Sequence, residues 1–196
     1  MGSHNITLTI ASEAHLHYVQ VIEQALFEAS QQKGTGIAVR SSDYLTAKMV
    51  EGKAVIAYSD EGHWAGFCYI ESWGHHKFVA NSGLIVSSRF RGFGLAGAIK
   101  KKALELSKQL FPDAKLFGLT TSLAVMKINN GLGYRPVTFS ELTDDDEFWK
   151  GCQTCPYYDI LVRTKREDCL CTAMIMDPKK KKGVNGKAHS SALKVN

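Results

Sequence analysis

The stretch VSSRFRGFGLAGAIKKKALELSKQL, residues Val86–Leu110, joins an apolar, strand-like run to a long helical pattern through closely spaced glycines. These glycines form the motif Gly92-x-Gly94-x-x-Gly97. Glycine lets the backbone approach a phosphate closely, and the free N–H groups at a helix start bind the anion. The stretch therefore predicts a loop that binds a phosphate-bearing ligand, with a simple strand-to-helix turn as the alternative.

The glycine spacing matches that of dinucleotide-binding loops, which also need an acidic residue at the end of the next strand, about 20 residues on. Asp113 lies at that distance but precedes the next apolar run, KLFGLTT. That run ends at Thr120 and Thr121 and supplies no acid. The context therefore disfavours a nicotinamide or flavin dinucleotide as the ligand.

The chain of 196 residues has the composition of an ordinary globular protein, with 44% hydrophobic and 22% charged residues. This length favours one domain, which we place at residues 5–178. The sequence has no apolar run of about 18 residues and no secretory pattern at its start. We therefore expect no membrane contact and a cytoplasmic location.

The net charge of +5 arises from the segment Lys179–Asn196, which has six lysines and no acidic residue. The rest of the chain has 18 basic and 19 acidic residues. Such a balance does not suit a nucleic-acid platform, so we expect no specific nucleic-acid partner. We predict that residues 179–196 form a disordered basic tail.

The hydrophobic pattern predicts alternating strands and helices. A strand at Ile6–Ile10 precedes helical patterns at residues 13–32 and 41–52. Three strand-like runs follow, and the short joints between them, SDEGH and WGHHK, favour antiparallel hairpins. After the helix that starts near Gly94, the pattern predicts a strand and a short helix. Further strands are expected at residues 134–142, 157–164 and 169–176, with a polar loop at 143–155.

The helix after the glycine loop carries one apolar face, formed by Leu95, Ile99, Ala103, Leu106 and Leu110. Three lysines of this helix, Lys100, Lys101 and Lys108, are expected to lie largely off that face.

The segment Arg91-Gly92-Phe93-Gly94-Leu95-Ala96 has the form Gln/Arg-x-x-Gly-x-Gly/Ala. This signature, with the order of strands and helices from Ile6 to Arg163, resembles the GNAT acyltransferases. The resemblance implies an α/β fold of the α+β type, with a central mixed and mostly antiparallel sheet flanked by helices. A Cys-rich C-terminal hairpin extension at residues 144–178 would be an addition to that fold.

The resemblance also implies that acetyl-CoA or succinyl-CoA is the acyl donor. Backbone amides from Gly92 to Gly97 would bind its pyrophosphate, and Leu84–Val86 would pair with its pantetheine arm. Gly83 stands where the fourth strand of this family bulges and opens a gap to the fifth. The predicted cofactor-binding residues are Leu84, Ile85, Val86, Arg91, Gly92, Phe93, Gly94, Leu95, Ala96, Gly97 and Asn129.

The customary base and acid of the family are replaced in this chain. Asn81, with Ser82 beside it, stands where the family often has a glutamate, and Asn129 stands where it has a tyrosine. Glu71 ends the third predicted strand and is the remaining carboxylate for a base, with an exposed strand-end acid as the alternative. We take Glu71, Asn81, Ser82 and Asn129 as catalytic candidates, with water held by Asn81 or Ser82 as a proton relay.

The loop after Lys33 and the helix that follows it cover the acceptor site in this family. Arg40 is the predicted acceptor-binding residue because its planar fork matches a carboxylate, and Lys77 and Arg89 are weaker candidates. The wider pattern, including KGTGIA, AGFCYIE and FGLTTSLAVMKIN, resembles a GNAT subgroup associated with N-acylation of glutamate in arginine biosynthesis. We therefore expect a small-molecule amine as acceptor, with L-glutamate as the leading candidate.

Four of the five cysteines form two close pairs, Cys152-x-x-Cys155 and Cys169-x-Cys171. Brought together, they would suit a tetrahedral structural zinc site. Ordinary buried thiols and a disulfide or redox switch are the alternatives. The fifth cysteine, Cys68, lies in the apolar run AGFCYI and is expected to be a small core residue.

The leading hypothesis is an N-acyltransferase in which the amine attacks the thioester directly within a ternary complex. A sensor that binds acyl-CoA without turnover is one alternative, because the usual glutamate and tyrosine are missing. A zinc-hairpin protein that binds nucleic acid or a protein partner is another. Either a monomer or a homodimer is compatible with the sequence.

Overall fold

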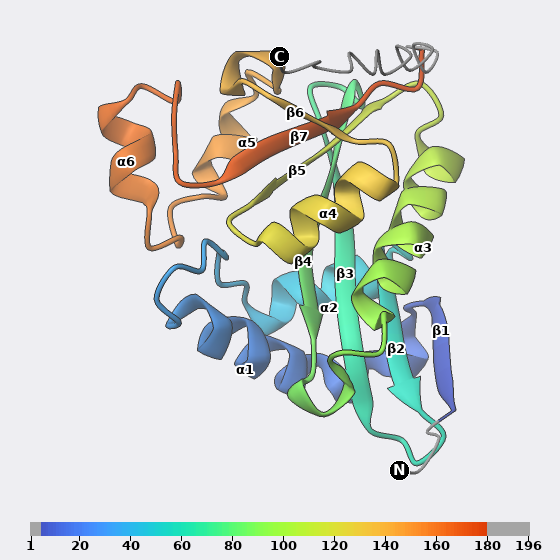
Figure 1. Ribbon diagram of the computed structural model, residues 1–196. Coiled ribbons are helices and arrows are strands. Elements are labelled where there is room, and N and C mark those ends of the chain that lie inside the picture. Colours follow the sequence, from blue (N-terminus) through green and yellow to red (C-terminus); the bar gives the residue numbers. More distant parts are fainter. Residues whose placement is uncertain (1–4, 180–196) are drawn as a thin grey trace, which may run out of the picture.

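The computed structural model describes residues 5–179, and the basic tail beyond them lies outside the described residues. No helix within this range is both long and apolar enough to cross a bilayer. The described chain forms one seven-stranded sheet in the order β1-β2-β3-β4-β5-β7-β6 (Figure 1). The strands are β1 (Ile6–Ile10), β2 (Ala54–Ser59), β3 (Trp64–Trp73), β4 (Phe78–Val86), β5 (Lys115–Thr120), β6 (Arg135–Val137) and β7 (Thr172–Met176).

The sheet is mixed and mostly antiparallel, as predicted, because only β4 and β5 pair in parallel. The joints between β2, β3 and β4 are tight hairpins, which force antiparallel pairing. A parallel neighbour needs a crossover, and helix α3 (Leu95–Leu110) supplies it between β4 and β5. The glycine loop thus lies at the one point where the sheet changes from antiparallel to parallel pairing.

Helices cover both faces of the sheet, and strand alternation decides which residues each face receives (Figure 1). On β2, Ala54 and Ile56 pack with helices α1 (Val19–Ser30) and α2 (Ser42–Val50). Val55 and Ala57 point the other way and pack in the core that α3 covers. A one-residue slip would exchange the two faces, so this pattern fixes the register.

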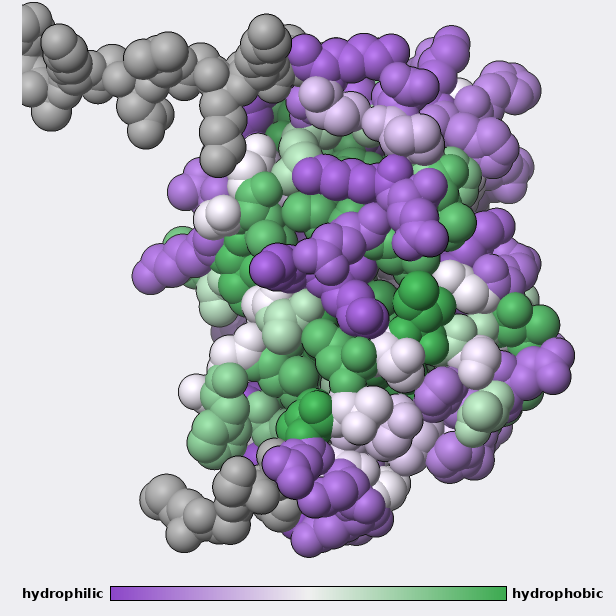
Figure 2. Space-filling view, turned by 90° about the vertical axis from the view of Figure 1, so that its right-hand side faces the viewer, coloured by the Kyte–Doolittle hydropathy of each residue, from purple (hydrophilic) through white to green (hydrophobic). Residues whose placement is uncertain are grey.

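The remaining helices are short. A 3₁₀ turn at Glu13–Tyr18 leads into α1, and α4 (Leu123–Gly131) lies between β5 and β6. Two further 3₁₀ turns occur at Ser88–Phe90 and Phe139–Glu141. Figure 2 views the side on which α3 lies and shows hydrophilic side chains crossing a surface on which hydrophobic side chains are also exposed.

Strands β6 and β7 are antiparallel neighbours, and the Cys-rich segment is the long connection between them. The strand predicted at residues 157–164 is wrong, because Tyr158–Arg163 forms helix α6. Only Leu161 of its apolar run is buried, whereas Val162 is 56% exposed, so the β-branched residues that suggested a strand do not pack as one. The loop predicted at 143–155 contains helix α5 (Asp146–Lys150), which the Asp145 side chain caps by accepting from the Glu147 amide.

Gly83 on β4 has a φ of +62°, and the pairing of β3 with β4 slips one residue at this point. A Cβ atom added to Gly83 would lie 2.5 Å from Cε1 of Tyr69. The bulge predicted at Gly83 is therefore present, and the missing side chain makes room for the Tyr69 ring.

We predict that Gly83→Ala lowers the free energy of unfolding by about 2–4 kcal/mol, because it combines an unfavourable φ with a clash. Gly62→Ala is the matched control, since Gly62 has a φ of +79° and nothing within 4 Å of an added Cβ. That variant should lose only about 1 kcal/mol. Chemical denaturation measures both values, and equal losses would show that Tyr69 does not press on Gly83.

Candidate active site

The glycine loop leaves its backbone open to a ligand. Gly92 and Gly94 have φ values of +87° and +77°, so both need glycine for their conformation. Among the described residues, no backbone hydrogen bond outside α3 is donated by the amides from Gly92 to Gly97. Arg91 steadies the start of the loop by donating from Nε to the Val86 carbonyl at 3.0 Å. The loop therefore offers free N–H groups at a helix start, as an anion site requires.

The environment of Gly97 distinguishes a phosphate-binding loop from a simple strand-to-helix turn. Its φ is not in the left-handed region, and an added Cβ would meet no atom within 4 Å. Neither the backbone conformation nor internal packing therefore requires glycine at this position. Close approach of an external group to the helix start is the remaining physical reason for it.

The gap between β4 and β5 begins near the middle of the sheet. Phe78, Val79 and Ala80 pair with β5 residues, and the last pair is Ala80 with Phe117. Beyond it the two strands separate, as Figure 1 shows. Leu84 is half-buried on the separated part of β4, whereas Ile85 and Val86 are buried. The predicted pantetheine-binding run therefore follows the opening and leads towards the glycine loop.

A cluster of charged and phenolic groups lies on the α2 side of the same strands. Arg40 donates from Nε to the Tyr69 hydroxyl at 2.9 Å and from Nη1 to the Gly151 carbonyl at 3.1 Å. Glu71 accepts from Lys48 Nζ at 2.6 Å and from the Tyr44 hydroxyl. The guanidinium of Arg40 and the ammonium of Lys48 both lie over the Tyr44 ring, at 5.3 and 5.0 Å from its centroid.

The phenols of this cluster are held in the neutral form. Burial raises the pKa of Tyr69, and the Arg40 guanidinium opposes that shift. Burial, followed by Tyr69 and Glu71, also raises the pKa of Tyr44. Both hydroxyls therefore act as hydrogen-bonding groups at neutral pH. The sequence pointed to Arg40 and Glu71, but their partners Tyr44, Lys48 and Tyr69 carry no motif and were missed.

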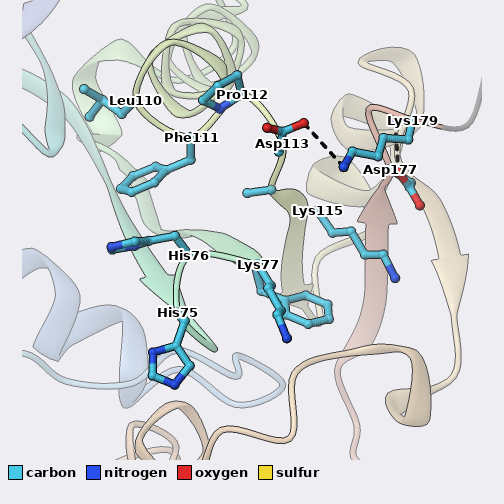
Figure 3. A pocket seen from close by; sticks show the side chains of 12 residues that line it. His75, His76, Lys77, Leu110, Phe111, Pro112, Asp113, Lys115, Asp177 and Lys179 are labelled. Carbon is cyan, nitrogen blue, oxygen red and sulfur yellow. Dashed lines mark hydrogen bonds and ion pairs between the residues drawn. The ribbon is translucent and has the colours of Figure 1, made fainter.

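The three predicted acceptor-binding cations lie in three separate neighbourhoods. Arg40 is in the cluster just described. Arg89 pairs with Glu61 at 3.2 Å and lines, with α1, a cavity of about 620 Å³. Lys77 lines a different cavity of about 720 Å³ at the end of α3 away from the glycine loop (Figure 3). That second cavity lacks both the loop amides and the strand gap, so we place the candidate site at the gap rather than there.

Asn81 and Asn129 are both buried on the α3 side of the sheet. Asn81 accepts from the Tyr134 hydroxyl at 2.7 Å and donates to the Ser107 hydroxyl at 2.8 Å. Asn129 has a buried Oδ1 with no hydrogen-bond partner among the described residues. Ser82 is half-buried beside Asn81, and its carbonyl accepts from the Cys68 thiol.

The position of Lys100 differs from the one that the sequence pattern of α3 predicted. The helical pattern placed this lysine off the apolar face, yet its side chain is only 2% exposed. Its Nζ donates to the Asn81 carbonyl at 3.1 Å. Ser107, two turns further along α3, is also fully buried, so a second and partly polar row of the helix faces the sheet.

The structure brings the four paired cysteines into one neighbourhood. Burial and then the thiols of Cys169, Cys155 and Cys152 raise the pKa of Cys171. Burial and then the Cys155 thiol raise the pKa of Cys152 to about 11, and Arg40 opposes this shift. Within residues 5–179, however, no group of three or more His, Cys, Asp or Glu side chains is arranged to hold a metal ion.

The cysteines adjoin the acceptor loop. A Cβ added to Gly36 would lie 3.0 Å from Sγ of Cys171, and the Gly36 amide donates to the Thr121 hydroxyl at 3.1 Å. Thr154 donates to the Val39 carbonyl at 3.1 Å. The segment therefore packs on the loop that carries Arg40.

Comparison with known proteins gives the architecture a name. The sequence matches no protein-family model, and no curated protein matches it. Solved structures do match: N-acetylglutamate synthase from Neisseria gonorrhoeae, complexed with coenzyme A and N-acetyl-glutamate, superposes with a TM-score of 0.63 at 13% identity over 91% of this chain. This chain has the GNAT fold. It spans only about a third, 36%, of that synthase chain.

Other GNAT-fold structures match over nearly their whole length. A Mycobacterium tuberculosis protein in complex with CoA has a TM-score of 0.63 at 13% identity, covering 87% of this chain and 98% of that one. A phosphinothricin acetyltransferase from Sinorhizobium meliloti, in complex with acetyl-CoA, has a TM-score of 0.59 at 15% identity, covering 93% and 97%. These likenesses establish the fold, and the open amides and the strand gap occur within it.

Proposed function

We propose that this chain is an acyl-CoA-dependent N-acyltransferase that acts on a small acidic amine. The observation that carries the proposal is the joint occurrence of two features at one end of α3. The amides from Gly92 to Gly97 are free to bind phosphate, and the gap between β4 and β5 leads directly to them. The three solved structures above were each obtained with CoA or acetyl-CoA, which supports the same ligand here.

The residues present fit such a ligand. The open loop would hold the pyrophosphate, and the exposed strand edge at Leu84–Val86 would receive the pantetheine amides. The glycines of the loop leave room that side chains would fill. Bound there, the thioester would lie in the gap with its carbonyl available to an amine from the α2 side. Holding the two reactants together would then provide much of the rate enhancement.

The acceptor would lie beside Arg40, Tyr69 and Lys48. A dicarboxylic amino acid such as L-glutamate suits this cluster because two cations lie over one ring while only one carboxylate, Glu71, is paired there. Both Glu71 oxygens are already hydrogen-bonded, to Lys48 and Tyr44. As a base, Glu71 would therefore take the amine proton only if the acceptor displaces one of these partners.

The finer parts of the hypothesis stay predictions. They are a succinyl instead of an acetyl donor, a role in arginine biosynthesis and a cytoplasmic location. The sensor alternative shares the ligand and differs only in lacking turnover.

We predict release of free CoA when the purified chain receives L-glutamate with either acetyl-CoA or succinyl-CoA. Chromatographic detection of CoA avoids interference from the protein's own thiols. Turnover with one donor identifies the acyl group as well as the reaction class. Tight CoA binding without turnover of any amine would contradict the enzyme and favour the sensor.

We predict that Arg40→Lys raises the KM for the acceptor about tenfold or more and leaves the KM for acetyl-CoA unchanged, because lysine lacks the planar fork. Arg135→Lys is the control, since Arg135 is an exposed arginine at the start of strand β6 that pairs with Glu141. Steady-state kinetics with each substrate varied separately gives both constants. Equal effects of the two variants would remove Arg40 from the acceptor site.

A further inference from the structure

Lys100 is a buried cation for which the structure provides no acid. Its side chain is 2% exposed in the core between α3 and the sheet. Among the described residues it makes no ion pair, and the titratable group that influences it is the Cys68 thiol. Burial lowers the pKa of Lys100, and Cys68 opposes the shift. Taking an unpaired ammonium out of water costs stability, and the one neutral carbonyl it bonds, that of Asn81, does not need a charged donor.

The ammonium lies where β4 and β5 separate. The last parallel pair is Ala80 with Phe117, so the next carbonyl of β4, that of Asn81, has lost its partner strand. Lys100 Nζ donates to this carbonyl at 3.1 Å. A helix side chain thus occupies the closed end of the strand gap through which the proposed thioester enters.

A small polar space lies beside this ammonium. The next residue of β5 is Gly118, and a Cβ added there would lie 3.7 Å from Lys100 Nζ and 3.7 Å from the Asn81 carbonyl oxygen. It would lie 4.0 Å from Nδ2 of Asn129. All three are ordinary contact distances, so groups from α3, β4 and α4 converge on the open side of Gly118, which has no side chain to separate them.

The groups around this space have unused hydrogen-bonding capacity. An ammonium has three N–H donors, and one of them is used. The Oδ1 atom of Asn129 is buried without a partner in the described chain. Buried polar groups are normally satisfied by protein, water or ligand. The unused ammonium donors suit an incoming acceptor atom, and the Asn129 oxygen suits a donor such as the S–H of released CoA.

The other titratable groups that face Lys100 are neutral at physiological pH. Burial raises the pKa of Cys68 on β3 and that of Tyr134, whose ring centroid lies 5.8 Å from Nζ. Asn81 and Asn129 complete the surroundings and carry no charge. Lys100 would therefore be the group that donates and accepts protons at this place.

We propose that Lys100 is a catalytic residue that donates a proton to the CoA sulfur as the thioester breaks. This inference rests on the proposed function. The amine nitrogen forms a bond to the acyl carbon, and the carbon–sulfur bond breaks with its electron pair on sulfur. The sulfur takes a proton from the Lys100 ammonium, and the nitrogen loses one to a base or to solvent. Lys100 is then reprotonated from solvent. It would serve in place of the tyrosine that Asn129 replaces.

The test compares the wild type with Lys100→Met and, as the control, with Lys101→Met at the neighbouring exposed lysine. Lys100→Met should lower kcat about 100-fold or more and leave the KM for acetyl-CoA unchanged, while Lys101→Met changes neither. An unchanged kcat for Lys100→Met in an enzyme that turns over would overturn the proposal.

A second readout does not need turnover. The ultraviolet absorbance of the thiolate, measured against protein saturated with desulfo-CoA, gives the pKa of the bound CoA thiol. Lys100 should lower that pKa in the wild type, and Lys100→Met should restore it. A bound-thiol pKa that is the same in both proteins would overturn the proton-donor role. If the wild type releases no CoA with any amine, the proposed function fails, and this titration still decides whether Lys100 acts on the thiol of bound CoA.

A third readout separates function from folding. Lys100→Met should have a higher Tm than the wild type, because removing an unpaired buried charge gains more than leaving the Asn81 carbonyl without its donor loses. A lysine whose pKa is depressed in the fold carries its penalty below the unfolded pKa of about 10.4, so the gap should close as pH rises towards that value. A lower Tm would mean that Lys100 is structural and would contradict the account. Lys100→Leu provides the same comparison if the methionine variant is poorly expressed.

Discussion

Strands β4 and β5 pair in parallel over three residues each and then separate after Ala80 and Phe117. A separated strand leaves carbonyl and amide groups unpaired, and buried backbone groups of this kind must find other partners. In this chain Lys100 satisfies the Asn81 carbonyl from α3, and the bulge at Gly83 turns the rest of β4 away. The edge thus freed at Leu84–Val86 leads to the amides of the glycine loop. The proposed acyl-CoA path thus depends on this one interruption of the sheet.

The acceptor side is built on the opposite face of the same strands. The Tyr69 ring fits over Gly83 because Gly83 has no side chain. The Tyr69 hydroxyl accepts a hydrogen bond from Nε of Arg40. Arg40 is also bonded to the Gly151 carbonyl, so the Cys-rich segment helps to set its direction. The bulge, the acceptor cluster and the C-terminal extension are thereby in contact with one another. A change in any of them should alter the position of the Arg40 guanidinium.

Much of the architecture could be predicted from local patterns. The hairpin joints and the glycine loop depend on backbone conformations that short sequence stretches specify, whereas the bulge at Gly83 was expected from the resemblance to the GNAT acyltransferases. The strand predicted at 157–164 failed because β-branched residues also occur in a short helix when only Leu161 needs to be buried. The burial of Lys100 could not be predicted, because helical periodicity cannot show that a carbonyl on β4 lacks a partner. The partners of Glu71 were missed for the same reason, since they come from α2 and are set by tertiary contact.

Calorimetric titration of acetyl-CoA into the wild type and into Gly97→Val tests the central claim most directly. A Cβ at position 97 meets no atom within 4 Å, and valine suits a helix better than glycine, so the variant should fold normally. The account predicts one acetyl-CoA bound per wild-type chain and at least about tenfold weaker binding to Gly97→Val, because the side chain would occupy the place of the pyrophosphate. No binding to the wild type, or equal binding to both proteins, would contradict it.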